Sequence, residues 1–150
     1  MIRGYFKTAD TGRQRPFIDA VFQFPTPEAS IVVPLLVDTG ADRTMLSPLD
    51  TNRLKVELGI DHETFGLGIP STGVGGRINT RVTDTVLRLD GFEISFEVTV
   101  LPPPESGPIS AIPSLLGRDI ISRFRLFVDQ RTERVLLLEE EDDVRILNLP

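Results

Sequence analysis

Regular alternation between apolar and polar side chains in the middle of the chain constrains its fold more than any other feature. The run 92–101 is apolar at alternate positions, namely Phe92, Ile94, Phe96, Val98 and Val100. A period of two is the signature of a half-buried β-strand. A second alternating run, residues 81–89, precedes it, and the dipeptide Asp90-Gly91 between the two runs is a strong hairpin signal. The sequence therefore predicts an antiparallel β-hairpin over residues 81–101.

Short apolar runs predict further strands on both sides of this hairpin. Residues 17–24 mix aromatic and β-branched side chains and stop at Pro25, which is typical of a strand. Residues 31–37 are apolar throughout and predict a strand buried on both faces, with Pro34 outside the hydrogen-bond ladder. The remaining candidate strands are the start of residues 114–124, residues 126–129 and 135–138, which form a second hairpin, and residues 144–149.

Helices are predicted at only two places. Ser47 is a suitable N-cap, Pro48 suits the first helical position, and Gly59 suits the stop, which predicts a helix between them. A shorter helix is expected after Gly117-Arg118. Twelve glycines and twelve prolines favour short strands and turns over a helical bundle.

These elements predict an all-β fold with one or two short helices. The 150 residues show no internal repeat and no low-complexity linker, so we expect one domain over residues 1–150. Its core is expected to span about residues 17–138, followed by an acidic C-terminal extension, residues 139–150.

Charge and composition limit the partners. The net charge is −6 and the basic residues are scattered, which argues against nucleic acid, because phosphate binding needs clustered Lys and Arg. There is no cysteine, so disulfides and thiolate chemistry are excluded. The N-terminus lacks the apolar segment of a signal peptide, and no apolar run approaches the roughly 20 residues that span a bilayer. We therefore expect a cytoplasmic protein that binds no membrane.

The only histidine removes several catalytic classes. His62 stands among polar residues and is predicted to be a surface side chain. With one histidine and no cysteine, a Ser-His-Asp triad and a multi-histidine zinc site both lack their parts. The acidic run 139–143 lacks the spacing of a calcium-binding loop and is interpreted as solvated surface. The sequence therefore predicts neither a metal nor a cofactor.

The tripeptide Asp-Thr-Gly occurs twice, in different surroundings. Asp38-Thr39-Gly40 directly follows the apolar run 31–37, whereas Asp10-Thr11-Gly12 follows a polar segment. Taken alone, either copy fits a turn in which Asp accepts backbone N–H bonds and Gly takes a positive φ. We interpret the N-terminal copy as such a turn and the copy at the end of the buried strand as a candidate site.

Three segments, in order, resemble the retropepsin-like (retroviral-type) aspartic proteases. LLVDTGADRTMLSP, residues 35–48, resembles their active-site segment, in which apolar residues lead into Asp-Thr/Ser-Gly-Ala. Gly73-Val74-Gly75-Gly76 resembles the tip of their flap, a glycine-rich hairpin that folds over substrate. LLGRDII, residues 115–121, resembles their second signature, which precedes a short helix. The resemblance covers about residues 17–138 and implies a closed β-barrel or sandwich with a flap hairpin.

The resemblance implies an aspartic endopeptidase with Asp38 as its catalytic carboxylate. Asp38 would activate the water that attacks the peptide carbonyl, Thr39 would hydrogen-bond across a dimer axis, and Gly40 would let the substrate backbone approach. Because two carboxylates in contact share one proton, one can act as base and the other as acid. The chain has one buried copy of the motif, so the pair would need a homodimer, with peptide or unfolded protein as substrate.

The resemblance also implies supporting residues. Ala41 and Asp42, with the flap glycines, would bind substrate, whereas Gly117, Arg118 and Asp119 would support the site. Two roles for Asp42 stay open, binding of the substrate backbone or pairing with Arg118, and for Arg118 we favour a structural ion pair because Arg suits a bidentate carboxylate partner.

Two departures and one alternative remain. Asp42 matches the second acid of the family segment, but the next residue is Arg43, where viral members commonly carry another acid, which leaves the substrate preference open. The long segment after residue 121 is closer to cellular and bacterial relatives than to viral enzymes, and residues 144–149 are one candidate interface strand. The alternative function is a catalytically silent dimerisation or peptide-binding module, since fold alone does not decide function. The intact Asp-Thr-Gly favours catalysis.

Overall fold

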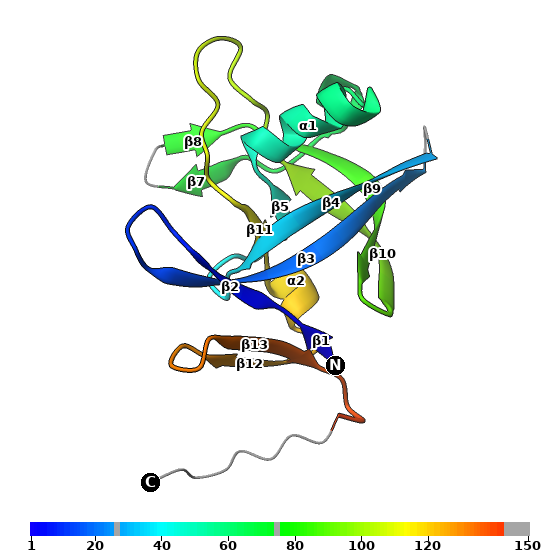
Figure 1. Ribbon diagram of the computed structural model, residues 1–150. Coiled ribbons are helices and arrows are strands. Elements are labelled where there is room, and N and C mark those ends of the chain that lie inside the picture. The colour runs from blue at the N-terminus through cyan, green and yellow to red at the C-terminus, as the bar shows by residue number, and fades with distance from the viewer. Residues whose placement is uncertain (26–27, 74–75, 143–150) are drawn as a thin grey trace, which may run out of the picture.

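The computed structural model describes residues 1–25, 28–73 and 76–142 of the chain (Figure 1). The strands are β1 (Ile2–Arg3), β2 (Tyr5–Thr8), β3 (Gln14–Pro25), β4 (Glu28–Val37), β5 (Met45–Leu46), β6 (Gly66–Leu67), β7 (Ser71–Gly73), β8 (Gly76–Ile78), β9 (Arg81–Leu89), β10 (Phe92–Val100), β11 (Ser114–Leu116), β12 (Arg125–Asp129) and β13 (Arg134–Leu138). The helices are α1 (Pro48–Leu58), the short 3₁₀ helix η1 (His62–Thr64) and α2 (Arg118–Ile121). The predicted strand at residues 144–149 lies outside the described residues.

Six strands close into a barrel, which confirms the predicted fold class. Their order is β3-β4-β11-β5-β10-β9, and β9 pairs back onto β3 to complete the ring. The closing pairs include Phe22 with Leu87. Two of the six pairings are parallel, β4 with β11 and β5 with β10, and the others are antiparallel. The long antiparallel hairpins supply most of the ring, while the short parallel pairs bring distant loops to one edge.

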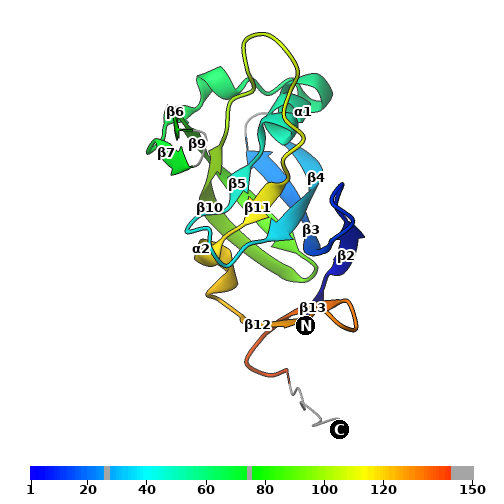
Figure 2. The same cartoon turned by 90° about the vertical axis from the view of Figure 1, so that its left-hand side faces the viewer.

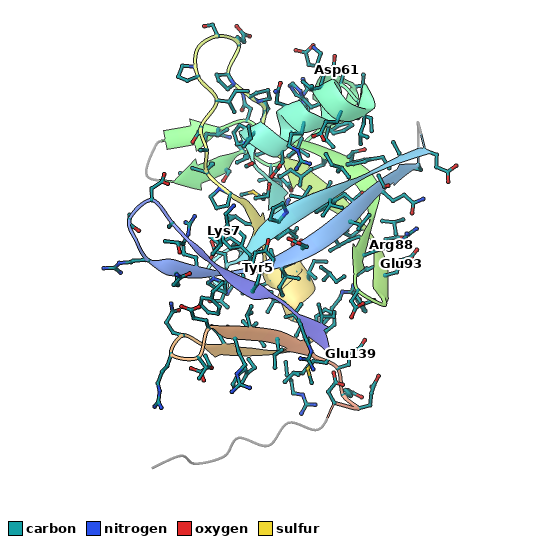
Figure 3. The ribbon with its side chains drawn as sticks, in the orientation of Figure 1. Tyr5, Lys7, Asp61, Arg88, Glu93 and Glu139 are labelled. Atoms are coloured by element: carbon teal, nitrogen blue, oxygen red, sulfur yellow. The ribbon has the colours of Figure 1, made fainter. Side chains whose placement is uncertain are left out.

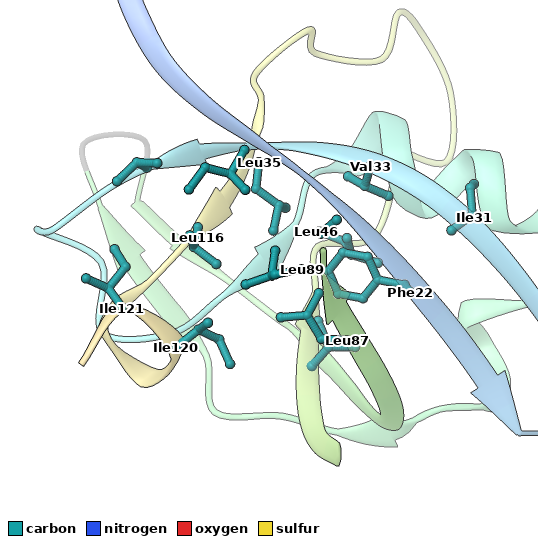
Figure 4. Packing of buried hydrophobic residues seen from close by; sticks show 14 of the residues in the cluster. Phe22, Ile31, Val33, Leu35, Leu46, Leu87, Leu89, Leu116, Ile120 and Ile121 are labelled. Carbon is teal, nitrogen blue, oxygen red and sulfur yellow. The ribbon is translucent and has the colours of Figure 1, made fainter. Parts of the chain in front are cut away.

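The alternating side chains fill the barrel (Figure 4). Completely buried members include Phe22, Val33, Leu35, Leu46, Leu87, Leu89, Val98, Val100 and Leu116. The predicted hairpin of residues 81–101 is confirmed: β9 and β10 pair along their whole length, and Asp90 takes a φ of 54° in the turn between them. Opposite charges also face each other on the outside, since Arg88 Nε lies 3.5 Å from Glu93 Oε2 (Figure 3).

The expectation that the strand at residues 31–37 is buried on both faces is wrong. In β4 the side chains of Val33 and Leu35 are fully buried, but Val32 is 53% exposed and Leu36 is half-buried. Only the inner face of a closed barrel meets the core, so alternate side chains point outward. Pro34 lies opposite Asp19 in the β3–β4 ladder and just before the β4–β11 ladder, which begins at residue 35.

The N-terminal residues form strands that the sequence did not reveal. β2 extends the barrel sheet beside β3, and β1 joins β13 and β12 in a separate three-stranded sheet below the barrel (Figure 1). Tyr5 Oη donates to Asp19 Oδ1 at 2.6 Å, and burial, reinforced by this bond, raises the pKa of Tyr5. These two strands are too short for their periodicity to be visible.

The predicted first helix is confirmed in detail. Ser47 is the N-cap of α1 and its side chain accepts from the Asp50 N–H at 3.3 Å. The helix ends at Gly59, which has a φ of 69° and donates its N–H to the Lys55 carbonyl.

Within the described ranges, no helix is both long and apolar enough to cross a membrane.

His62 is less exposed than predicted. Its side chain is only 15% exposed and lines a cavity of about 1040 Å³ between α1 and residues 102–105. Other lining residues, such as Pro102 and Pro103, are distant in sequence, so the polar neighbours of His62 did not reveal its reduced exposure. The residues that line this cavity include none from the three family-like segments.

Barrel closure makes Phe22 the most sensitive apolar position. Its side chain is 0% exposed and lies in the register that joins β3 to both β4 and β9. Phe22→Ala should lower the free energy of unfolding by about 3–5 kcal/mol, because the cavity it leaves cannot collapse inside a closed ring. Urea denaturation measures the change, with Val56→Ala on the exposed face of α1 as the control. Val56→Ala should change stability by less than about 0.5 kcal/mol, and equal losses in both variants would contradict the closure argument.

Candidate active site

Asp38 lies at the first turn after β4, at one end of the barrel. Its backbone N–H donates to the Leu116 carbonyl of β11 at 3.0 Å, which ties the loop to the neighbouring strand. The Gly40 N–H donates to Asp38 Oδ1 at 2.9 Å, and Oδ2 accepts no hydrogen bond from any described residue. Asp38 is partly exposed, and Thr39 and Gly40 are exposed. The carboxylate is thus oriented through one oxygen and keeps the other accessible.

The two Asp-Thr-Gly copies differ as the sequence predicted. Asp10-Thr11-Gly12 is a turn between β2 and β3, in which the Gly12 N–H donates to the Ala9 carbonyl and Gly12 has a φ of 79°. Gly40 is not among the residues with positive φ. A Cβ at Gly40 would lie 3.2 Å from Asp38 Oδ1, so a side chain there would crowd the carboxylate.

The family-like segment at residues 115–121 lies directly beneath this loop. In Figure 2, α2 is next to the loop that follows β4, and the flap strand β7 is above it. The Arg118 N–H donates to the Ala41 carbonyl at 2.8 Å, and the Asp119 N–H donates to the Asp42 carbonyl at 3.2 Å. The start of α2 therefore supports the loop through backbone bonds.

Thr44 is a supporting residue that sequence reasoning missed. It is 0% exposed. Its backbone N–H donates to both Asp119 carboxylate oxygens, at 2.9 and 3.0 Å, and its hydroxyl donates to Asp119 Oδ1 at 2.7 Å. The same hydroxyl accepts the Gly117 N–H at 3.0 Å. A polar residue just before a short strand was the only sequence signal, and it does not name the distant partner.

Gly117 is required by the same close packing. A Cβ on Gly117 would overlap the backbone of Arg43 and Thr44, which leaves no room for a side chain. The Gly117 and Asp119 positions were predicted to support the site, and here they pack against and bond to the loop that carries Asp38.

Asp42 and Arg118 form an ion pair between Asp42 Oδ1 and Arg118 Nη2. Both side chains are well exposed, at 79% and 58%, so the pair contributes little stability by itself. Of the two roles left open for Asp42, pairing is present in the structure, and binding of substrate stays a prediction.

A β-hairpin stands at the position expected for the flap. β7 and β8 pair antiparallel, with Ser71 opposite Ile78 and Gly73 opposite Gly76. Gly76 has a φ of 98°, a conformation that glycine adopts without strain. Val74 and Gly75, also predicted for the flap tip, lie outside the described residues.

A pocket of about 410 Å³ lies between the Asp38 loop and the flap hairpin. Residues 40–43 line one side, and residues 69–72 at the base of the flap line the other. Met45 and Thr99 are also among the lining residues. The fold therefore brings together Gly40, Ala41, Asp42 and the flap strands, while Gly117 and Asp119 lie outside the pocket as support. Among the described residues, no three His, Cys, Asp or Glu side chains group as metal ligands would.

Removal of the Thr44 hydroxyl should loosen the Asp38 loop. Thr44→Val keeps the shape of the side chain but leaves the buried Gly117 N–H without its acceptor. We expect a loss of about 1–3 kcal/mol in the free energy of unfolding, together with faster hydrogen exchange at the Asp38 and Arg118 amides.

Thr51→Val is the matched control for this variant. The Thr51 side chain is equally buried, and its hydroxyl donates to the Ser47 carbonyl, which also accepts the Thr51 N–H. Removing this hydroxyl leaves no buried donor without an acceptor. The loss in free energy of unfolding should therefore be smaller than in Thr44→Val, and hydrogen exchange at the Asp38 amide should be unchanged. Unchanged exchange at Asp38 in Thr44→Val would show that the loop does not depend on Thr44.

Comparison with known proteins finds similarity at the level of structure. No protein-family model and no curated protein matches the sequence. The structure is similar to EIAV protease complexed with the inhibitor HBY-793, with a TM-score of 0.50 and 26% sequence identity over 77% of this chain and 92% of that chain. It is also similar to a retropepsin-like aspartic protease from Rickettsia conorii, with a TM-score of 0.59 and 18% identity over 88% of this chain and 95% of that one. These matches confirm the resemblance predicted from the three segments.

Proposed function

We propose that this chain, which has the retropepsin-like fold of aspartic proteases, is an aspartic endopeptidase that acts as a homodimer. One observation supports this most strongly: the partly exposed Asp38 carboxylate stands at a braced loop beside a pocket that the flap hairpin borders. The names of the two similar proteins describe proteases, which favours the same chemistry here.

The homodimer follows from the chemistry of peptide hydrolysis. One carboxylate must take a proton from the attacking water while another group protonates the departing amine. Each chain offers one Asp-Thr-Gly at a buried strand end, so a second Asp38 must come from another copy. In a two-fold dimer the same surface of each copy meets at the axis, which places the two Asp38 carboxylates together.

Roles for the neighbours follow from their positions. Thr39 is exposed and free to hydrogen-bond to its equivalent in the second copy. Gly40 and Ala41 line the pocket, and the Gly40 carbonyl, which accepts no hydrogen bond from a described residue, would accept one from an extended peptide. The flap hairpin would close over the peptide and exclude water during the reaction. The expected substrate is a peptide or an unfolded protein segment, and a cytoplasmic location stays a prediction from the sequence.

The first experiment is digestion of a mixture of unfolded proteins, with the fragments read by mass spectrometry. Asp38→Asn should reduce the cleavage rate by at least about 100-fold, since acid–base catalysis commonly supplies 10²–10⁴. Asp10→Asn is a matched control, because it makes the same change in the other Asp-Thr-Gly, which is a turn. It should cleave like the wild type.

Two results would oppose the proposal. Cleavage that persists in Asp38→Asn would assign the activity to a contaminant or to another site. No cleavage by the wild type, with dimers demonstrated by sedimentation at the assay concentration, would favour the silent peptide-binding module.

The pH dependence should follow the shared proton. Two carboxylates in contact need one proton between them for acid and base to coexist. Above the optimum both are ionised and the acid is missing, whereas below it both are protonated and the base is missing. The cleavage rate should therefore be bell-shaped with its maximum on the acid side of neutrality, measured with one peptide from about pH 3 to pH 9. A rate that rises steadily to pH 9 would contradict a carboxylate pair.

A further inference from the structure

Arg43 is the unpaired charge of the pocket beside Asp38. Its side chain is exposed and lines the pocket, and it makes no ion pair or hydrogen bond with any residue that the structure describes. The only other charged lining residue is Asp42, which is already paired with Arg118. The pocket therefore presents one uncompensated positive charge on a chain whose overall charge is −6.

The backbone at Arg43 is held in place. Gly117 packs directly against the Arg43 carbonyl, and the next residue, Thr44, is bonded to Asp119 through both its N–H and its hydroxyl. A charge on a rigid loop loses less conformational entropy on binding than one on a mobile loop. Arg43 therefore carries its positive charge from a fixed backbone position on the loop that follows Asp38.

Hydroxyl-bearing side chains supply about half of the remaining lining of the pocket. Ser71, Thr72, Thr80 and Thr99 all contribute to it. The Thr80 hydroxyl is already used, since it donates to the Ile69 carbonyl at 2.8 Å. Thr99 is different, because it is only 4% exposed and its hydroxyl bonds to no described residue.

The position of Thr99 directs its side chain toward the pocket. Its neighbours in β10, Val98 and Val100, are fully buried in the barrel, so Thr99 points to the other face of the sheet. There it pairs with Met45 of β5, a residue that lines the same pocket. Among the described residues, only Arg15 Nε is a buried side-chain polar atom without a hydrogen-bond partner. The unpaired Thr99 hydroxyl is therefore open to the pocket and can donate to a ligand there.

We propose that this pocket selects an acidic side chain, glutamate before aspartate, in the peptide that the protein binds. The Arg43 guanidinium would pair with the carboxylate at the pocket rim, and the Thr99 hydroxyl would donate to it or to an oxygen beside it. The longer glutamate side chain reaches further from an extended backbone into the pocket. The inference rests on the proposed binding of peptides next to Asp38, and it names a specificity determinant for that site.

Paired digestions test the selection. Wild type, Arg43→Gln and Arg43→Glu would digest the same unfolded proteins, and the residues within three positions of each cleaved bond would be counted. Wild type should favour Glu over Lys at one position by about tenfold, a ratio typical of one charge-assisted hydrogen bond. Arg43→Gln should abolish the preference, and Arg43→Glu should reverse it toward Lys and Arg. Arg131→Gln and Arg131→Glu, in the exposed β12–β13 turn, control for overall charge and should keep the wild-type preference.

A binding assay separates this inference from the proposed activity. The Asp38→Asn protein, labelled with ¹⁵N, would be titrated with extended peptides identical except for Glu, Gln or Lys at one position. Tighter binding of the Glu peptide, with a shift of the Arg43 side-chain Nε signal that Arg43→Gln removes, supports the selection even if the wild type cleaves nothing. Thr99→Val should weaken binding of the Glu peptide about threefold or more. Equal affinity for the three peptides, or a Glu preference that survives Arg43→Gln, would overturn the inference while leaving Asp38-dependent cleavage unaffected.

Discussion

The hydrogen bonds between Thr44 and Asp119 are the interaction on which the rest of the site depends. They join two segments 75 residues apart in the chain. Thr44 belongs to the loop that follows Asp38, and Asp119 lies at the start of α2. The Asp119 carboxylate accepts two donors of Thr44, while the Thr44 hydroxyl also accepts from Gly117. Because each of these buried polar groups is satisfied by another, changing one leaves its partners unsatisfied.

The topology of the barrel makes this join possible. β4 and β11 are parallel neighbours, so their C-terminal ends lie at the same end of the barrel. The residues that follow them, Asp38 after β4 and Gly117 after β11, are thereby brought side by side. The hydrogen bond from the Asp38 N–H to the Leu116 carbonyl links the two segments just beyond the paired strands. A carboxylate held by backbone bonds at a strand end is well ordered and still accessible, which the proposed acid–base role would require.

The flap hairpin and the Asp38 loop define different halves of the pocket. The loop is braced from below, with Gly117 packed against it so closely that no side chain fits. The flap strands β7 and β8 pair only with each other and form a sheet separate from the barrel. The Asp38 loop is rigid, whereas the hairpin has few hydrogen-bond partners outside itself. This combination would suit a site that an extended peptide enters before the hairpin covers it. Arg43 and Thr99 lie on the side of the Asp38 loop, where the proposed specificity contact would have a fixed backbone.

The sequence alone determined much of the outline. Alternation located β9 and β10, capping residues located α1 to within a residue, and the apolar run before Asp38 distinguished it from Asp10 in an identical tripeptide. These features are local, since a turn, a cap or a strand face depends on residues close in sequence. Only the tertiary structure decided the others: the outward face of Val32, the low exposure of the His62 side chain, and the bonds of Thr44 to Asp119. Each of them depends on which strands become neighbours when the barrel closes, and pairings between distant segments leave no local pattern that could be recognised beforehand.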